Sequence, residues 1–184
     1  YFNEGLKTIT TAAGFCYLSN IKFIHFPNTL ESIQANAFDF WNGCSLEKII
    51  LPSSLTSLGQ HCFQNLTKCS LIDLSRANIT EIPDYCFRSY KAPEDGTTTI
   101  VKVPASLTTI GYQAFQGMKS IYEFEFQEGI TQIGDHSFEN TSIQSVVWPK
   151  SLTTHKDYSC VFTGCPVSYF DMGDGLQTLP ARMS

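Results

Sequence analysis

Residues 46–69 read LEKIILPSSLTSLGQHCFQNLTKC, and this stretch decides the fold because close copies of its pattern occur before and after it. It holds an alternating apolar segment that ends in Pro52, then two leucines three residues apart, then a phenylalanine preceded by a small residue. Alternation at period two predicts a short strand, and proline ends it because proline has no N–H to donate. So short a strand cannot bury a face alone, and the copies are therefore expected to stack.

The phenylalanine and the aliphatic pair recur along nearly the whole chain. Successive phenylalanines are 25, 24, 28, 23 and 24 residues apart, at Phe38, Phe63, Phe87, Phe115, Phe138 and Phe162. The aliphatic pairs share one register, at Leu6/Ile9, Leu30/Ile33, Leu55/Leu58, Ile79/Ile82, Leu107/Ile110, Ile130/Ile133 and Leu176/Leu179. A repeat of about two dozen residues with this regularity predicts a solenoid whose coils share one hydrophobic core.

The alternating segments predict one short parallel strand per repeat. They lie at residues 24–27, 49–52, 101–104, 124–126 and 146–149. The inward residues are expected to be Ile24/Phe26, Ile49/Leu51, Val101/Val103, Phe124/Phe126 and Val146/Trp148. Short helical or irregular turns are expected on the other side of each coil.

The order of these elements resembles the BspA-like leucine-rich repeat family. Its unit is a strand, proline, a small polar pair, an aliphatic pair, glycine, and a small residue before phenylalanine. The match is closest at Leu46, Ile49, Leu51, Pro52, Leu55, Leu58, Gly59, Cys62, Phe63 and Cys69. The resemblance implies a leucine-rich repeat superhelix, and it implies surface adhesion with host or matrix contact.

Residues 1–184 are expected to form a single leucine-rich repeat domain of about six full repeats with partial repeats at both ends. The third unit, which contains Leu71, Leu74 and the pair Ile79/Ile82, lacks the proline after its strand. Residues 91–96 are expected to project as a loop. His155 stands where an aliphatic residue is expected. Neither end supplies a polar cap, so we expect a fragment of a longer array.

Composition argues against several classes of function. The formal charge is −5 from 12 basic and 17 acidic residues, without a basic cluster, which argues against a nucleic-acid partner. No apolar run reaches the roughly 18 residues of a membrane-spanning helix, so no membrane insertion is expected in this segment. The chain begins at Tyr1 and shows no signal-peptide pattern.

The sequence carries no motif that favours catalysis, a cofactor or a metal. Nucleophile-elbow, phosphate-loop and dinucleotide-loop patterns are absent, and no cysteine pair has zinc-site spacing. His61 and His136 share a polar slot two residues before phenylalanine and are interpreted as exposed turn residues. We therefore expect a protein that is not an enzyme.

The seven cysteines leave three readings open: core thiols, disulfides or metal ligands. Cys62 and Cys86 fill the small slot before phenylalanine, which favours core thiols. A bridge between Cys44 and Cys69 remains possible, because equivalent positions of stacked coils lie about 5 Å apart, and Cys160 with Cys165 is a second possible pair. Three glycosylation sequons begin at Asn65, Asn78 and Asn140.

Outward-facing strand residues form the predicted ligand-binding face. They are Phe23, His25, Lys48, Ile50, Leu71, Asp73, Ile100, Lys102, Glu123, Glu125, Val147, Tyr169 and Asp171. Several are apolar, which marks an interaction site, although strand propensity alone is the alternative explanation, and Lys102 is expected to pair with Glu123 or Glu125.

We predict that this face, or the edge at residues 91–96, binds a protein or extracellular-matrix ligand at the cell surface or after secretion. The alternative is a structural scaffold or spacer in a larger, cytoplasmic assembly. Catalysis is the weakest of the three possibilities, because no residue constellation supports it.

Overall fold

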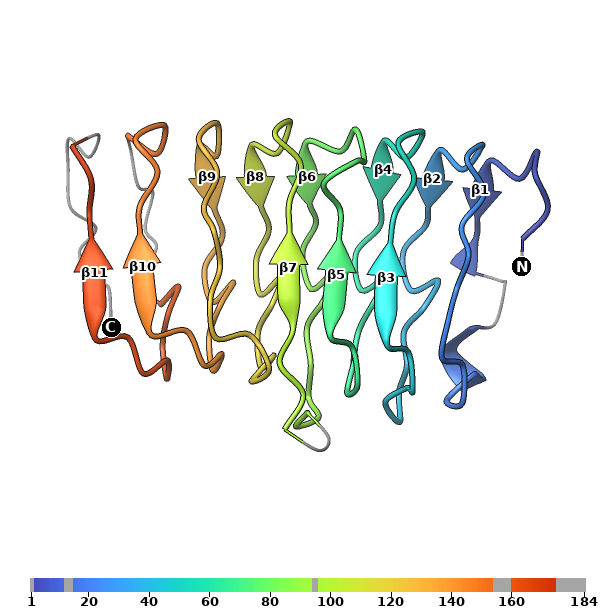
Figure 1. The fold of residues 1–184 in the computed structure, drawn as a ribbon, viewed down its shortest axis with the longest axis horizontal. Coiled ribbons are helices and arrows are strands. Elements are labelled where there is room, and N and C mark those ends of the chain that lie inside the picture. Colours follow the sequence, from blue (N-terminus) through green and yellow to red (C-terminus); the bar gives the residue numbers. More distant parts are fainter. Residues whose placement is uncertain (1, 12–14, 94–95, 154–159, 175–184) are drawn as a thin grey trace.

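A computed structural model of the chain describes residues 2–11, 15–93, 96–153 and 160–174. In these ranges the chain forms a parallel β-solenoid, in which each coil runs up through a front strand and returns behind it (Figure 1). The described ranges contain one helix, the 3-10 helix η2 (Phe15–Tyr17). This architecture confirms the predicted leucine-rich repeat solenoid with irregular turns.

The front of the solenoid carries two parallel sheets. One contains β3 (Lys48–Ile50), β5 (Leu71–Asp73) and β7 (Ile100–Lys102). The other contains β10 (Ser145–Val147) and β11 (Tyr169–Asp171). Strand neighbours pair in register, so equivalent residues of successive coils stand side by side (Figure 1).

A second line of short strands was not predicted. It consists of two parallel sheets, β1 (Thr8–Ile9), β2 (Ser32–Ile33) and β4 (Ser57–Leu58), and then β6 (Glu81–Ile82), β8 (Thr109–Ile110) and β9 (Gln132–Ile133). The prediction of one strand per repeat was therefore wrong. Each of these strands ends in the second member of an aliphatic pair, which points into the core while the extended backbone pairs with the next coil.

The segments around the phenylalanines form a third set of contacts between coils. The N–H of Phe63 donates to the carbonyl of Cys86 at 2.9 Å, and that of Phe87 donates to Ala114 at 2.8 Å. The residue two positions before five of the six phenylalanines has a positive φ between 51° and 59°, at Asn36, His61, Tyr85, Gln113 and His136. A left-handed residue turns the chain there, and its repetition keeps successive turns in register.

The predicted phenylalanine column forms the centre of the core. Rings of adjacent coils stack nearly parallel, with centroids 5.2 Å apart for Phe38 and Phe63 and 5.2 Å apart for Phe87 and Phe115. Phe115 and Phe138 continue the column at 5.3 Å, and both side chains are fully buried. Phe40 is also fully buried, although the repeat pattern did not predict it.

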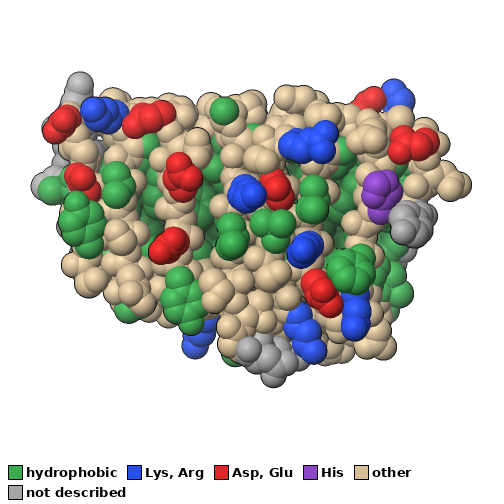
Figure 2. Space-filling model, viewed as in Figure 1, with side chains coloured by type: hydrophobic (Ala, Val, Ile, Leu, Met, Phe, Trp, Pro, Cys, Tyr) green, Lys and Arg blue, Asp and Glu red, His purple; other side chains and the backbone are tan. Residues whose placement is uncertain are grey.

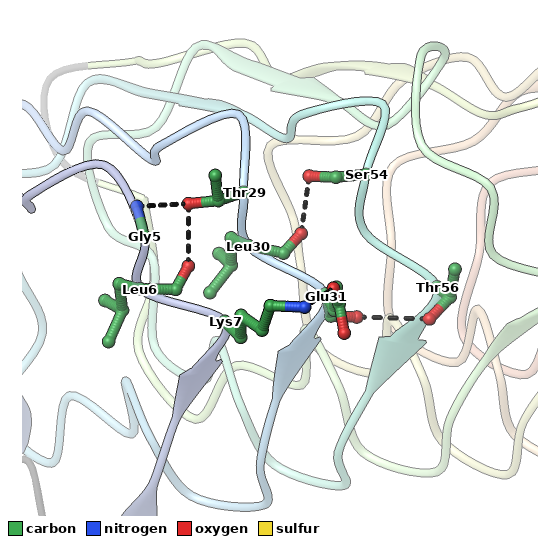
Figure 3. Close-up of polar contacts among 8 residues, drawn as sticks. All are labelled: Gly5, Leu6, Lys7, Thr29, Leu30, Glu31, Ser54 and Thr56. Carbon is green, nitrogen blue, oxygen red and sulfur yellow. Dashed lines mark hydrogen bonds and ion pairs between the residues drawn. The ribbon is translucent and has the colours of Figure 1, made fainter.

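Hydroxyl groups after the prolines link each coil to the one before it (Figure 3). The Thr29 hydroxyl donates to the carbonyl of Leu6 at 3.0 Å, and the Ser54 hydroxyl donates to that of Leu30 at 2.6 Å. Ser106 and Ser151 repeat this contact in later coils. The small polar residues of the repeat therefore satisfy backbone carbonyls that the turns leave without a ladder partner.

Glycine recurs after the aliphatic pair because the coils approach closely there. A Cβ atom at Gly59 would lie 2.1 Å from the backbone nitrogen of Ala35, and one at Gly134 would lie 2.5 Å from the backbone of Gly111. Real Cβ atoms do not approach backbone atoms so closely. The amide of Gly59 uses this approach to donate to the Ile33 carbonyl at 2.8 Å.

Two predicted strands are not strands in the structure. Residues 24–27 form no strand, and the one bridge beside them joins Phe23 to Lys48. Residues 124–126 are unpaired although Phe124 and Phe126 do point inward, where their ring centroids lie 4.8 Å apart. Two inward phenylalanines two residues apart take more room than the aliphatic residues at the inward positions of β3 or β5.

The remaining departures in the repeat have separate outcomes. The third unit pairs on both sides as β5 although it lacks the proline, so proline is not required for pairing. The chain around residues 91–93 and 96 extends below the neighbouring coils, as predicted (Figure 1). His155, Leu176 and Leu179 lie outside the described residues.

Candidate functional site

The strand face holds the predicted ligand-binding residues in two rows. Parallel register places Lys48, Leu71 and Ile100 side by side in one row. It places Ile50, Asp73 and Lys102 side by side in the other. The bridge at Phe23 extends the first row, while Tyr169 and Asp171 stand opposite Ser145 and Val147.

Apolar side chains on this face are exposed to solvent. The exposed fractions are 65% for Phe23, 50% for Ile50, 59% for Ile100, 57% for Val147 and 57% for Tyr169. His25, Lys48, Lys102, Glu123, Glu125 and Asp171 are exposed as well. The expectation that every outward-facing strand residue is exposed was wrong for two residues. Leu71 and Asp73 in the central strand β5 are half-buried between β3 and β7.

Charged side chains separate these apolar groups, as Figure 2 shows for this view of the molecule. The Lys102 ammonium lies 4.0 Å from the Asp73 carboxylate, within the same row. The expected pairing of Lys102 with Glu123 or Glu125 is thus replaced by a pairing with Asp73, because β5 is hydrogen-bonded to β7 and residues 122–126 are not.

The described part of the strand face contains hollows. A hollow of about 250 Å³ lies over the first coils, where Phe23, Lys48, Ile50 and Arg76 line it. Two more, of about 440 and 380 Å³, flank the unpaired segment 122–126 and are both lined by Glu123 and Glu125. The strand face is therefore basic at the hollow near the N-terminus and acidic at the other two.

A second group of polar and aromatic residues lies on the return side of the coils. His61 stacks on Tyr85 with ring centroids 4.5 Å apart, and Tyr112 meets the ring of His136 edge-on at 6.0 Å. The prediction that the two histidines are exposed was wrong, because these neighbours leave both only half-exposed. His136 also lies 2.8 Å from a carboxylate oxygen of Glu139.

Trp41 and Tyr90 belong to this return side and were missed by the sequence reading. Their exposed fractions are 73% and 65%. Both stand three residues after a core phenylalanine, where other coils place the buried residues Leu66 and Met118. The sequence did carry a signal for these two residues. A tryptophan or tyrosine stands at a position of the repeat that other coils fill with a buried apolar residue.

Six of the cysteines form no disulfide bond: Cys44, Cys62, Cys69, Cys86, Cys160 and Cys165. The core-thiol reading therefore describes this structure, and neither the Cys44 to Cys69 bridge nor the Cys160 to Cys165 bridge is formed. The Cys62 and Cys86 sulfur atoms lie 3.4 Å apart in the core. Burial raises the pKa of the Cys44 thiol to about 11 and that of Cys69 to about 12.

Those raised pKa values predict a loss of stability at alkaline pH. A Cys69 thiol with an ordinary pKa of 9.0 in the unfolded chain ionises there while it stays neutral in the folded chain. The unfolded state then holds fewer protons, so the free energy of unfolding falls as pH rises from about 9 to about 12, by up to about 1.4 kcal/mol per pH unit for this thiol. Urea unfolding measures the free energy of unfolding of the wild type and of Cys69→Ala at several pH values between about 9 and 12. That free energy should fall less steeply with pH in the variant. Parallel slopes would contradict the assignment.

The sequons differ in accessibility. Asn65 is 4% exposed and accepts a hydrogen bond from the Tyr90 N–H at 2.9 Å, so its side chain is poorly accessible to a glycosylating enzyme. Asn78 and Asn140 are exposed. Among the described residues no three His, Cys, Asp or Glu side chains are placed to hold a metal ion. Nor do those residues form a helix of the length and apolar character that spans a membrane.

The fold and the strand face define a leucine-rich repeat protein, a class of protein-interaction modules that is in general non-catalytic. A profile of the family described as "BspA type Leucine rich repeat region (6 copies)" matches residues 1–94 and 94–182. The chain therefore belongs to the BspA-type leucine-rich repeat family. A search of curated proteins gave no match.

Two solved structures are similar to this chain. A leucine-rich repeat protein from Bacteroides ovatus has 18% sequence identity and a TM-score of 0.69, over 92% of this chain and 48% of that protein. A leucine-rich cell surface protein from Faecalibacterium prausnitzii has 17% identity and a TM-score of 0.42, over 97% of this chain and 59% of that protein. The chain thus spans about half the length of these proteins, and the first likeness supports the fold.

Proposed function

We propose that this chain is a non-catalytic adhesion module whose strand face binds a protein or extracellular-matrix ligand. The observation that carries the proposal is the set of exposed apolar side chains that the strand register aligns on one face, from Phe23 to Tyr169. Exposed apolar groups gathered on one face and surrounded by charge favour interaction with another macromolecule.

The distribution of charge on the strand face favours a partner with opposite charges at its two ends. Lys48 and Arg76 border the hollow over the first coils, whereas Glu123 and Glu125 border the hollows around residues 122–126. A partner with an acidic end and a basic end, joined by apolar residues, complements this face in one orientation. Complementary charge of this kind sets orientation and association rate more than affinity.

Charge reversal on the strand face tests the proposal. The triple variant Lys48→Glu, Lys102→Glu and Glu125→Lys is expected to bind about tenfold more weakly to those matrix proteins, in a purified panel, that bind the wild type. Biolayer interferometry measures the two affinities. A control with the same net charge change, Lys7→Glu, Lys119→Glu and Glu81→Lys, alters other surfaces and should bind normally. Equal binding by both triple variants would place the site elsewhere.

The second candidate is a scaffold or spacer within a cytoplasmic assembly, and the absence of disulfide bonds at the six described cysteines favours it. Proteins of reducing compartments keep their cysteines reduced, whereas secreted proteins commonly carry disulfides. If the chain is an adhesion module, we propose that it is located at the cell surface or is secreted. Thiol titration of the natural protein under denaturing conditions separates the two, because intact bridges are expected only after secretion.

A further inference from the structure

The return side of the first three coils contains a hollow of about 540 Å³ that shares no residue with the strand face. Asp39 and Trp41 line it from one coil, His61 and Asn65 from the next, and Tyr90 from the third. Its volume lies within the range of about 300–1,000 Å³ that is usual for small-ligand sites. The hollow is therefore large enough for a ligand of its own.

The polar floor of the hollow is held in place by neighbouring coils. His61 is fixed by stacking on Tyr85, with the two ring planes 11° apart, and by a hydrogen bond between its Nδ1 atom and the amide of Gln64. Asn65 is fixed by the hydrogen bond that its Oδ1 atom accepts from the Tyr90 N–H. A ligand would therefore meet polar groups whose positions are already set, which lowers the entropy lost on binding.

Two exposed aromatic rings border this floor. Trp41 and Tyr90 leave most of their surface open to solvent, and neither belongs to the core. The Arg88 guanidinium lies 4.3 Å from the centroid of the Tyr90 ring, which orients that ring by a cation–π contact. Large aromatic rings exposed beside fixed polar groups match a ligand with both an apolar face and hydrogen-bonding edges.

Charge around the hollow disfavours an anionic ligand. Among the described residues, those that line it include the carboxylate Asp39 and no lysine or arginine. Burial raises the pKa of the Asp39 carboxyl, and the nearby His61 lowers it in part. A phosphate or carboxylate ligand would be repelled by the Asp39 carboxylate, and the nearby Arg88 guanidinium lies on the Tyr90 ring and does not line the hollow. A hydroxyl group, in contrast, can donate to the Asp39 carboxylate.

The backbone around the hollow disfavours an extended peptide. The N–H of Asn65 already donates to the Arg88 carbonyl at 3.0 Å, and that of Asn36 donates to the Gln60 carbonyl at 3.0 Å. A peptide that adds to a sheet edge needs free backbone groups of this kind. The backbone N–H groups of these turns already donate to the next coil, so a ligand here must be recognised by side chains.

We propose that this hollow binds a neutral pyranose unit of a glycan. A pyranose ring has an apolar face of C–H groups, whose partial positive charge is attracted to the negative face of an aromatic ring. Its hydroxyl groups donate and accept in the ring plane, where carboxylate, imidazole and amide groups can meet them. Trp41 and Tyr90 supply the stacking surfaces, while Asp39, His61 and Asn65 supply the polar contacts.

The test titrates the whole chain with neutral mono- and disaccharides of glucose, galactose, mannose and N-acetylglucosamine. Binding is read from the indole N–H signal of Trp41 in heteronuclear NMR spectra. Trp148 is 3% exposed and provides the internal reference. We expect at least one neutral sugar to shift the Trp41 signal saturably while the Trp148 signal stays in place. No shift with any neutral sugar, or a response only to phosphate, acidic sugars or peptides, would overturn the proposal.

Matched variants locate the site. Tyr90→Ala should weaken the binding of that sugar about tenfold or more, as read from the Trp41 signal, because it removes one stacking surface. Asp39→Asn keeps the shape of the side chain and should also weaken binding. Tyr112→Ala removes a tyrosine outside the hollow, and Phe23→Ala alters the strand face, and both should bind normally. Unchanged binding by Tyr90→Ala and Asp39→Asn, in variants with the wild-type unfolding midpoint, would refute the placement.

Discussion

Replacing Phe115 with alanine is expected to lower the free energy of unfolding by about 3–5 kcal/mol, through lost burial and the cavity that remains. Phe115 is fully buried and stacks on Phe87 and Phe138, with ring centroids 5.2 and 5.3 Å away. The cavity would interrupt the column between two coils whose backbones are fixed by lateral hydrogen bonds, so little collapse is possible. Urea unfolding followed by far-UV circular dichroism measures the change.

Phe23→Ala provides the control for this substitution. It removes the same atoms from a side chain that is 65% exposed on the strand face. Surface substitutions of this kind change stability by about 0.5 kcal/mol or less. If the two alanine variants lost similar amounts of stability, the phenylalanine column would not be the core that the structure describes.

Replacing Gly59 with alanine is expected to destabilise the protein by about 2–3 kcal/mol, although only one methyl group is added. The added Cβ would lie 2.1 Å from the Ala35 nitrogen, so the two coils must separate. Separation strains the hydrogen bond from Gly59 to the Ile33 carbonyl and the pairing of β2 with β4. Thermal and urea unfolding should both report the loss.

Gly96→Ala adds the same methyl group where no atom lies within 4 Å, at a glycine with a φ of +68°. It should cost only about 1–2 kcal/mol, which is the penalty of a left-handed alanine. A Gly59→Ala variant that is no less stable than Gly96→Ala would show that the coils do not approach as closely as described.

The sequence predicted the core of this fold because the core repeats. Phe63, Leu55 and Ile49 each occupy a column, and stacking obliges every column to be apolar. The second line of strands was missed because its members are two residues long, as at Ser57–Leu58, and too short to show alternation. Pairing there comes from the register of the whole coil and not from a local pattern.

The same reasoning explains what could be predicted of the candidate sites. The outward positions of the strands follow from alternation, and Ile50, Ile100 and Val147 are exposed as predicted. The burial of Leu71 depends on its position between two paired strands, which a single repeat does not show. Trp41 and Tyr90 come together across three coils through turn geometry, and no spacing in the sequence reveals that.

The unpaired segment 122–126 interrupts the front line of strands and separates the sheet of β3, β5 and β7 from the sheet of β10 and β11. Behind it, β8 and β9 remain paired, and the Ser120 carbonyl and the Ser142 N–H join it to both neighbouring coils at its lower end. At this point the coils are hydrogen-bonded through the second line of strands but not through the front strands. The two hollows that flank this segment therefore lie between the two front sheets, where no strand pairing crosses the face.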